Sequence, residues 1–341
     1  MPFLNGTGIH LIPARSYRKN AAVWTLCSNL QAFLIEQRMH PAIELEKVSK
    51  QFGTFHAVQD LSMEVKAGEI YGFLGPNGSG KSTTLRMLLA LIKPTSGDIK
   101  VFGHPMRTER SRIMGKIGCI IEKPDFYTYL TAQKNIELMA RASGIRYKAA
   151  DYTRLFELVG LSGREQDKVK TYSHGMKQRL GLAQALVHDP DLIILDEPNT
   201  GLDPQGIIDL RNLLVRLNRE QGKTILLSSH ILSEIEEIAH SMIVLNKGKT
   251  VAQGRVQELL SNEDLHVAVE IVGDIEAAAR KIIASGWQPY FTGQQEQTLR
   301  FNLSKPMIPA LNDFLVTEQI PVQRIEYKRQ LEEYFLKMTH A

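Results

Sequence analysis

The stretch Gly75-Pro-Asn-Gly-Ser-Gly-Lys-Ser-Thr83 follows the Gly-x4-Gly-Lys-Ser/Thr rule for a loop that cradles phosphate groups. Residues 69–74 before it are predicted to form a short buried strand, and residues 84–90 after it a helix. Glycines in the loop let backbone N–H groups turn inward onto an anion, and the helix N-terminus adds partial positive charge. Lys81 can reach the β- and γ-phosphates of a nucleoside triphosphate, and Ser82 can join the shell of a magnesium ion. The predicted nucleotide-binding residues of this loop are Gly75, Pro76, Asn77, Gly78, Ser79, Gly80, Lys81, Ser82 and Thr83.

The composition is that of an ordinary globular protein, with 43% hydrophobic and 23% charged residues. The 341 residues allow a sizeable core and more than one domain. A net charge of +4 is too small to indicate nucleic acid or an acidic lipid surface as a partner. Cys27 and Cys119 form no metal-ligand spacing and no disulfide framework, which favours a reducing compartment. No apolar run approaches the ~18 residues needed to span a bilayer, so a role at a membrane requires a partner protein.

Residues 1–40 differ from the rest of the chain. They contain one acidic residue, Glu36, and show no capped periodic element before about Ala22. Residues 22–35 could form one helix, but polar residues interrupt any apolar core of a signal peptide. We expect Met39 to be the natural start and residues 1–38 to be an over-extended reading frame. A transit peptide is the alternative.

Two further regions follow this extension. Residues 41–262 alternate predicted strands and helices, which indicates an α/β layer fold. Within them, residues from about 124 to 172 are mostly helical and are predicted to form an inserted lobe. Residues 265–341 show a separate β-α-β-β-α-β order, which predicts a small ferredoxin-like α+β module. Its predicted strands are 266–272, 289–292, 298–303 and 322–327, its helices are 275–285 and 307–318, and a short helix follows at 330–338.

The stretch Asp191-Leu-Ile-Ile-Leu-Asp-Glu-Pro198 predicts a second part of the site. Its four apolar residues indicate a strand buried on both faces. Two carboxylates follow at the carboxyl end of the strand, where open α/β sheets bind ligands. Asp196 fits the magnesium shell, and Glu197 fits the base that polarises an attacking water molecule.

The stretch Ser173-His-Gly-Met-Lys-Gln-Arg179 predicts a third part. Ser173 is a predicted helix N-cap and Gly175 allows close backbone approach, so N–H groups again converge on an anion. Alone, the pattern could be only a capped basic helix. Its position between the phosphate loop and the strand before Asp196 favours a role in the same site.

Together these motifs resemble those of the ATP-binding subunit of ABC transporters, over roughly residues 41–260. Tyr172-Ser-His-Gly-Met176 stands where the family has its Leu-Ser-Gly-Gly-Gln signature. Gly201-Leu-Asp-Pro204 matches the D-loop, His230 the switch histidine, and Phe52 the aromatic residue that stacks on adenine. The resemblance implies a P-loop ABC ATPase domain, a mixed sheet core with an inserted helical lobe, joined here to the small C-terminal module.

The resemblance also implies a mechanism and partners. The protein would hydrolyse ATP with Mg²⁺ as a head-to-tail homodimer. Ser173 and Gly175 of one protomer would close over the γ-phosphate bound by the other, and Asp203 would communicate between the sites. Glu197 and His230 would be catalytic, His230 contacting the γ-phosphate and orienting the water. A separate transmembrane permease is implied, with this chain peripheral at the cytoplasmic face of the membrane and no nucleic acid bound.

The chain departs from the family pattern at Glu122, where the family has a glutamine at the end of the strand predicted at 116–121. An ionised glutamate only accepts hydrogen bonds, whereas glutamine also donates them. Its charge beside magnesium should favour metal binding, since carboxylates are ordinary magnesium ligands. The alternative is that the change is tolerated and neutral.

The signature segment also departs from the family pattern, with Tyr172, His174 and Met176 in place of Leu, Gly and Gln. These departures and the stretch Leu331-Glu-Glu-Tyr-Phe-Leu336 resemble the bacitracin-type and lantibiotic-immunity branch, whose members export peptide antibiotics. Other hydrophobic peptides, lipids or drugs are the alternative substrates.

Three aromatic residues follow Glu122, at the place where this family docks a coupling helix of the membrane subunit: Phe126, Tyr127 and Tyr129. They could equally be core residues of the lobe.

Two other functions of the protein are also open. One is an ABC-type ATPase acting in translation or DNA metabolism, although this chain has neither two fused ATPase units nor a long coiled-coil insertion. The other is an ATPase whose C-terminal module binds a regulator.

Overall fold

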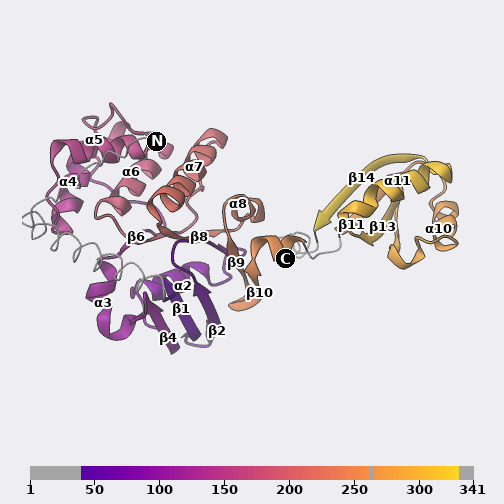
Figure 1. Ribbon diagram of the computed structural model, residues 1–341, viewed down its shortest axis with the longest axis horizontal. Helices are drawn as coiled ribbons and strands as arrows, with labels where there is room; N and C mark the ends of the chain where they lie inside the picture. The colour runs from indigo at the N-terminus through magenta and orange to yellow at the C-terminus, as the bar shows by residue number, and fades with distance from the viewer. Residues whose placement is uncertain (1–39, 262–264, 330–341) are drawn as a thin grey trace, which may run out of the picture.

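The computed structural model describes residues 40–261 and 265–329 (Figure 1). The predicted helices at 22–35 and 330–338, the stretch 331–336 and Met39 lie outside these residues. Within the described ranges, no helix has both the length and the apolar character needed to cross a membrane.

A six-stranded sheet forms the centre of the first region. Its strands from β9 to β6 are parallel, and β10 pairs antiparallel with β9 at one edge. In spatial order the strands are β10 (Lys249–Arg255), β9 (Ser241–Asn246), β3 (Ile70–Leu74), β8 (Thr224–Ser229), β7 (Leu192–Leu195) and β6 (Ile117–Ile120). The mixed sheet with helices confirms the predicted α/β class.

The central strands are buried on both faces because alternate side chains enter two different cores. In β7, Ile193 and Leu195 belong to one apolar cluster, and Leu192 and Ile194 belong to the other. The side chains of strand β3 are distributed between the same two clusters. Side chains that alternate along a strand point to opposite faces, so this sheet is the middle layer of the region, and its carboxyl edge is held rigidly from both sides.

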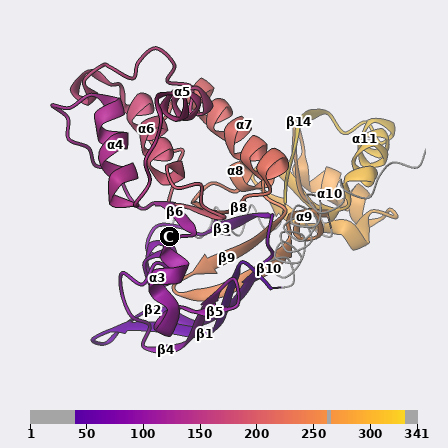
Figure 2. The same cartoon turned by 60° about the vertical axis from the view of Figure 1, so that its left-hand side comes forward.

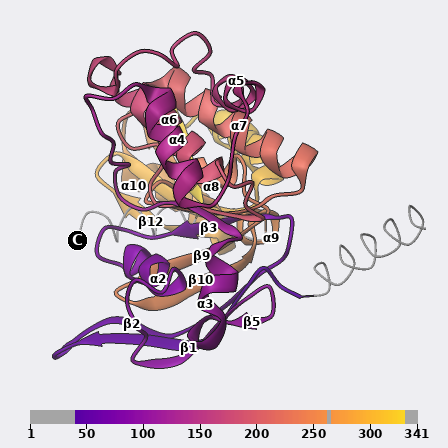
Figure 3. The same cartoon turned by 90° about the vertical axis from the view of Figure 1, so that its left-hand side faces the viewer.

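On one face, an antiparallel four-stranded sheet packs with two helices. The elements are β1 (Ile43–Phe52), β2 (Phe55–Val65), β4 (Ser96–Val101), β5 (His104–Pro105), α2 (Lys81–Leu88) and α3 (Met106–Met114). Figure 3 shows α2 between β3 and β9 on one side and β1 and β2 on the other. Leu85 and Leu88 of α2 are fully buried in the core that these layers share.

On the other face lie the helices of the lobe and the remaining helices of the first region (Figure 2). Leu180 of α6 and Leu217 of α7 are fully buried in the core that contacts this face. The elements are α4 (Ala132–Ala142), α5 (Ala149–Leu158), the 3₁₀ turn η1 (Val169–Thr171), α6 (His174–Leu186), α7 (Pro204–Gln221), α8 (Leu232–Glu236) and α9 (Val256–Ser261).

The C-terminal module has its own sheet and its own apolar core. Its elements are β11 (Leu265–Ile271), α10 (Ile275–Ile283), the 3₁₀ turn η2 (Gln288–Tyr290), β12 (Phe291–Gln295), β13 (Thr298–Leu303), the 3₁₀ turn η3 (Lys305–Met307), α11 (Ile308–Thr317) and β14 (Val322–Arg329). The sheet order is β12-β13-β11-β14, all antiparallel. Strand β11 alternates buried and half-buried residues, which is the pattern of a sheet covered on one face. Figure 1 shows the module beyond α9.

Some element boundaries differ from those predicted. The helix after the phosphate loop begins at Lys81, not at residue 84, because Gly80 adopts a left-handed conformation and ends the loop there. In the module, Pro289 lies in the turn η2 and the strand begins only at Phe291. Proline lacks a backbone N–H and suits the first turn of a helix, where that group would have no partner within the helix.

Candidate active site

The phosphate loop is tightly packed against its surroundings. A Cβ atom at Gly75 would lie 2.5 Å from the Ser79 hydroxyl oxygen, and one at Gly80 would lie 2.6 Å from the Ala57 carbonyl oxygen. Gly80 also has a φ of 108°, which L side chains rarely adopt. As the N-cap of α2, Gly80 supplies no side-chain cap. The first N–H groups of α2 therefore keep their capacity to bind an anion.

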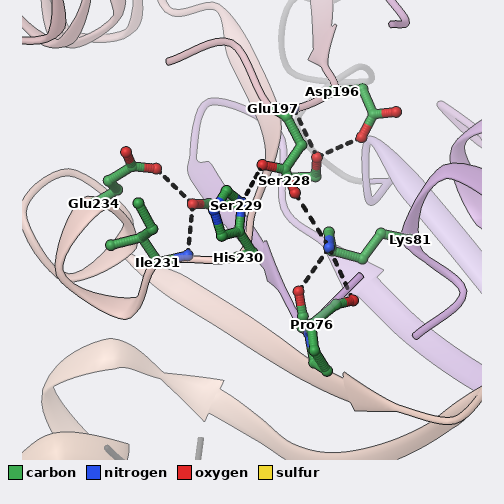
Figure 4. Close-up of polar contacts among 10 residues, drawn as sticks. Pro76, Lys81, Asp196, Glu197, Ser228, Ser229, His230, Ile231 and Glu234 are labelled. Atoms are coloured by element: carbon green, nitrogen blue, oxygen red, sulfur yellow. Dashed lines mark hydrogen bonds and ion pairs between the residues drawn. The ribbon is translucent and has the colours of Figure 1, made fainter. Parts of the chain in front are cut away.

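Lys81 lies at the centre of the site (Figure 4). Only 5% of the residue is exposed. Its Nζ donates to the carbonyl oxygens of Gly75 and Pro76 at 2.6 and 3.2 Å, and lies 3.2 Å from Oε1 of Glu197. The ammonium group is thus held by three oxygens, two from the loop and one from the strand end opposite, at the position where phosphate oxygens would compete for it.

Asp196 and Glu197 follow β7 at its carboxyl end and are held by Ser228 of the neighbouring strand β8. The Ser228 hydroxyl donates to Oδ1 of Asp196 at 2.6 Å and accepts a hydrogen bond from the Glu197 N–H at 2.9 Å. Asp196 is buried, and Glu197 adopts a positive φ of 49°. Such backbone strain in a residue other than glycine is typical of functional sites. The turn directs two adjacent carboxylates to different partners.

His230 follows β8 and contacts Glu197. The imidazole Nδ1 lies 2.5 Å from Oε2 of Glu197, so this carboxylate has Lys81 on one oxygen and His230 on the other. The preceding residue, Ser229, donates to Glu234 at 2.5 Å and accepts from the Ile231 N–H at 2.9 Å. These contacts fix the turn from which the His230 side chain extends.

Ser228, Ser229 and Glu234 were not among the predicted site residues. The sequence does hold a signal for the two serines, because they interrupt the apolar strand Thr224–Ser229 just before His230. Both are buried, at 0% and 1% exposure. Two buried hydroxyl groups at the carboxyl end of a central strand must find partners. Ser228 donates to Asp196 at the end of β7, and Ser229 donates to Glu234 of α8.

The signature segment begins helix α6. Ser173 is the N-cap, and its hydroxyl accepts from the Met176 N–H at 3.2 Å. A Cβ atom at Gly175 would meet nothing closer than 3.5 Å, an ordinary van der Waals contact. The fold of the single chain therefore does not itself require glycine at this position.

The signature segment is tied to the D-loop by His174. Its Nε2 lies 3.1 Å from the carbonyl oxygen of Thr200. The next residue, Gly201, has a φ of 77°, and a Cβ atom there would lie 2.6 Å from the same Nε2. Asp203 ends the D-loop as the N-cap of α7, accepting from the Gly206 N–H at 3.1 Å. The two loops thus form one unit, which the sequence motifs alone did not indicate.

Two predicted residues lie apart from the group around Lys81. Phe52 ends β1 and is 49% exposed, with the Lys50 Nζ 4.8 Å above its ring. Glu122 follows β6 with a φ of 62° and forms an ion pair with Arg86 of α2. Its side chain is 63% exposed. Within the described ranges neither residue forms a hydrogen bond or ion pair with Glu197, and their predicted roles toward adenine and magnesium stay predictions.

Burial and hydrogen bonding shift two pKa values around the signature helix. Burial raises the pKa of Tyr172 to about 12, so its hydroxyl stays a donor, to the Arg164 carbonyl oxygen at 2.7 Å. Hydrogen bonds from Gln205 and then Arg179 lower the pKa of Asp209. The Arg179–Asp209 pair, at 2.5 Å, links α6 to α7.

The three lobe aromatics differ in burial. Phe126 is partly buried against the core of the lobe. Tyr127 and Tyr129 are 57% and 66% exposed and stack edge to face with ring centroids 6.0 Å apart. Of the three, only Phe126 packs against the core of the lobe, and the two tyrosines are exposed on its surface, where docking of a coupling helix stays a prediction.

The donor set at the strand end suits a magnesium ion bound together with phosphate. Within residues 40–261 and 265–329, no group of three or more His, Cys, Asp or Glu side chains could hold a metal. Mg²⁺ is commonly held by one or two carboxylates plus substrate phosphates, in place of an all-protein cage. Asp196 at the end of β7 and Ser82 in the first turn of α2 are oxygen donors of that kind.

The chain is similar to known proteins in sequence and in fold. The model of the ABC transporter family matches residues 58–200. An uncharacterised ABC transporter ATP-binding protein of Bacillus subtilis, YhcH, is 38% identical over 303 residues, 88% of this chain and 97% of that protein. The bacitracin transport ATP-binding protein BcrA of Bacillus licheniformis is 38% identical over 301 residues, 88% of this chain and 98% of that protein. A solved dimeric ATP-binding cassette with bound ADP and phosphate is 25% identical, with a TM-score of 0.57 over 63% of this chain and 98% of its own.

Proposed function

The chain belongs to the ATP-binding subunits of ABC transporters and is an ATPase, and we propose that it powers export of a peptide antibiotic or another hydrophobic compound. The likeness to a bacitracin transport protein covers 88% of the chain and so is not limited to the nucleotide-binding motifs. It supports export as the direction and does not favour the alternative of an ATPase in translation or DNA metabolism. A separate membrane permease would form the path, with this subunit at the cytoplasmic face.

The observation that carries the proposed chemistry is the Lys81–Glu197–His230 arrangement. Phosphate oxygens of ATP would replace Glu197 and the loop carbonyl oxygens around the Lys81 ammonium group. Glu197 would then be released to accept a proton from water while the water oxygen bonds to the γ-phosphorus and the bond to ADP breaks. His230 would hold the Glu197 carboxylate in position and contact the γ-phosphate.

Magnesium would be held by Asp196, Ser82 and Glu122. When bound, it would neutralise charge on the phosphate oxygens. For Asp196, the hydrogen bond from Ser228 fixes one oxygen and leaves the other for a ligand. Phe52, which is exposed at the end of β1, would stack on the adenine ring.

The proposed active form is a head-to-tail homodimer. Ser173 and Gly175 of one protomer would close over the γ-phosphate bound by the other. Gly175 supports this arrangement because the single chain has room for a side chain there, so the need for glycine would come from the partner's nucleotide. Asp203, joined to the signature segment through the D-loop, would connect the two sites.

The test is affinity purification of Glu197→Gln protein from solubilised membranes with ATP, followed by mass spectrometry. The variant should bind ATP without hydrolysing it and hold the closed dimer. A multi-span membrane protein at near-equal stoichiometry is the expected companion, and it should be absent when Lys81→Ala is added to the same variant. Ribosomal proteins, nucleic acid or no companion would overturn the transport proposal.

A further inference from the structure

The C-terminal module ends in a strand with one unpaired edge. Strand β14 is eight residues long and stands last in the sheet order β12-β13-β11-β14. It pairs with β11 on one side, and no other described strand pairs with its outer side. Figure 1 shows β14 at the margin of the module, beside α11. A long edge strand offers a row of backbone donors and acceptors to another chain.

The sequence of β14 is complementary to itself. If two copies pair antiparallel with Ile325 opposite Ile325, Arg324 of each copy lies opposite Glu326 of the other. Within one chain these two side chains form an ion pair on the same face of the strand, and they are 63% and 45% exposed. Opposite charges facing each other across two strands are favourable, and like charges are unfavourable. This register therefore matches every charge at the centre of the edge.

A groove beside β14 supports the same register. It has a volume of about 550 Å³ and is lined by residues of α11, of β14 and of the segment between them, including Asn312, Val316, Gln319, Val322, Gln323 and Ile325. Val316 is 64% exposed and Tyr327 is 49% exposed. In the register above, Tyr327 of one copy lies opposite Gln323 of the other, at this groove. An antiparallel pair of identical strands also places the helices of both copies on one side of the joined sheet, with two-fold symmetry.

We propose that the C-terminal module joins two copies of this chain by pairing β14 with β14, in the register that places Ile325 opposite Ile325. The contact is separate from the nucleotide-dependent contact of the ATP-binding region and does not rest on the export proposal. It holds two subunits together without nucleotide. Each aromatic Tyr327 covers the groove of the other copy, and two Arg324–Glu326 pairs form between the chains.

Charge exchange tests the pairing in the full-length protein without nucleotide. Arg324→Glu makes the centre of the edge acidic, and Glu326→Arg makes it basic. By analytical ultracentrifugation, wild type should be a dimer, and each variant should dimerise at least about tenfold more weakly. An equal mixture of the two variants should regain dimers. The ion pair within each chain stays broken in that mixture, so the recovery can arise only between chains. A monomeric wild type, or a mixture that stays dissociated, would overturn the proposal.

Cross-linking tests the register. In protein whose Cys27 and Cys119 are changed to Ser, Tyr327→Cys and Gln323→Cys place one thiol each on exposed positions. A mixture of the two variants should form a short-linker cross-link between chains, because directly opposite residues lie about 5 Å apart. Either variant alone should not, because two identical positions would then be four residues apart along the strand. Equal cross-linking in all three samples would show a contact of another kind and reject this register.

Discussion

The active site and the C-terminal module place their charged groups in opposite ways. In the active site the charges are buried and converge, and Lys81 and Asp196 are each 5% exposed. The module's core cluster contains only apolar residues, with Phe301 fully buried, while pairs such as Lys281–Glu318 lie at its surface. Buried charges cost stability unless they are paired. The charged groups of the first region therefore serve ATP hydrolysis, whereas the module is held together by apolar packing. Substitutions in the first region should change activity, and substitutions in the core of the module should change stability.

The largest effect is expected for Lys81→Ala, which should abolish most ATP hydrolysis and leave the stability of the module unchanged. Removing the cation of the phosphate loop should lower kcat/KM for ATP hydrolysis at least about 100-fold, because the developing charge on phosphate loses its closest counter-charge. Amide hydrogen exchange in residues 265–329 should not change. Phosphate-release kinetics on the purified protein measures the first effect and mass spectrometry the second.

Lys223→Ala is the matched control. Lys223 is also a buried lysine, 8% exposed, and its Nζ pairs with Asp189 at 2.5 Å, away from the phosphate loop. This variant should unfold at a lower temperature and keep its turnover. Equal loss of hydrolysis in both variants would mean that burial of the cation, not its place in the loop, explains the first result.

The opposite result is expected for Phe301→Ala in the module, which should lower stability and leave ATP hydrolysis in place. Phe301 is fully buried and stacks with Phe291, ring centroids 5.5 Å apart. Its truncation should destabilise the module by about 3–5 kcal/mol, through lost burial and the cavity left behind. Hydrogen exchange should rise in residues 265–329 of the full-length protein, while ATP hydrolysis persists. Val272→Ala, at a 56% exposed position of the same module, should change neither. A matching loss of hydrolysis would show that the two regions are not independent.

The two regions also differ in what could be predicted. The phosphate loop and the strand before Asp196 were predictable because each motif is local: a few consecutive residues contain both the turn and the chemistry. In the module, the β-α-β-β-α-β order of predicted elements indicated a small α+β fold, but no motif in residues 265–341 indicated a ligand. An order of strands and helices predicts how a chain folds and not what it binds, and so the sequence predicted a fold for the module and no function.

Contacts between distant segments could not be predicted in either region. The His174–Thr200 contact joins residues 26 positions apart, and the Arg86–Glu122 pair joins residues 36 positions apart. Each contact joins a helix to a loop from a distant part of the chain, and so depends on how the elements pack around the sheet. The start of α2 at Lys81 was also missed, because a glycine in the left-handed conformation can end a loop at any of several positions.

A smaller effect on ATP hydrolysis is expected when His174 of the signature segment is replaced. The His174→Ala variant loses the hydrogen bond to the Thr200 carbonyl oxygen and with it the link between signature and D-loop. One such bond is worth about 0.5–1.5 kcal/mol, so kcat should fall by no more than about tenfold, with little change in ATP affinity. His174→Gln, which can still donate to a carbonyl oxygen, should recover much of the loss. If alanine and glutamine variants behave alike, the hydrogen bond has no role in turnover.

The smallest effect is expected for Glu122→Gln, which restores the residue typical of the family. Glu122 and Arg86 are 63% and 42% exposed, and an ion pair between such exposed side chains contributes at most about 1 kcal/mol. The glutamine carbonyl oxygen can also replace the carboxylate as an oxygen donor to magnesium. ATP binding should therefore be unchanged and basal hydrolysis nearly so. The coupling of hydrolysis to export should shift, because Glu122 contacts Arg86 of the phosphate-loop helix and shortly precedes the exposed Tyr127 and Tyr129 along the chain. Export per ATP hydrolysed, measured in vesicles with the permease, tests this.

The control is Glu109→Gln, which breaks an exposed pair with Arg112 on α3 and should leave the ratio of export to ATP hydrolysed unchanged. If Glu122→Gln also leaves it unchanged, the glutamate is a neutral replacement, and the coupling must run through other contacts between the lobe and α2.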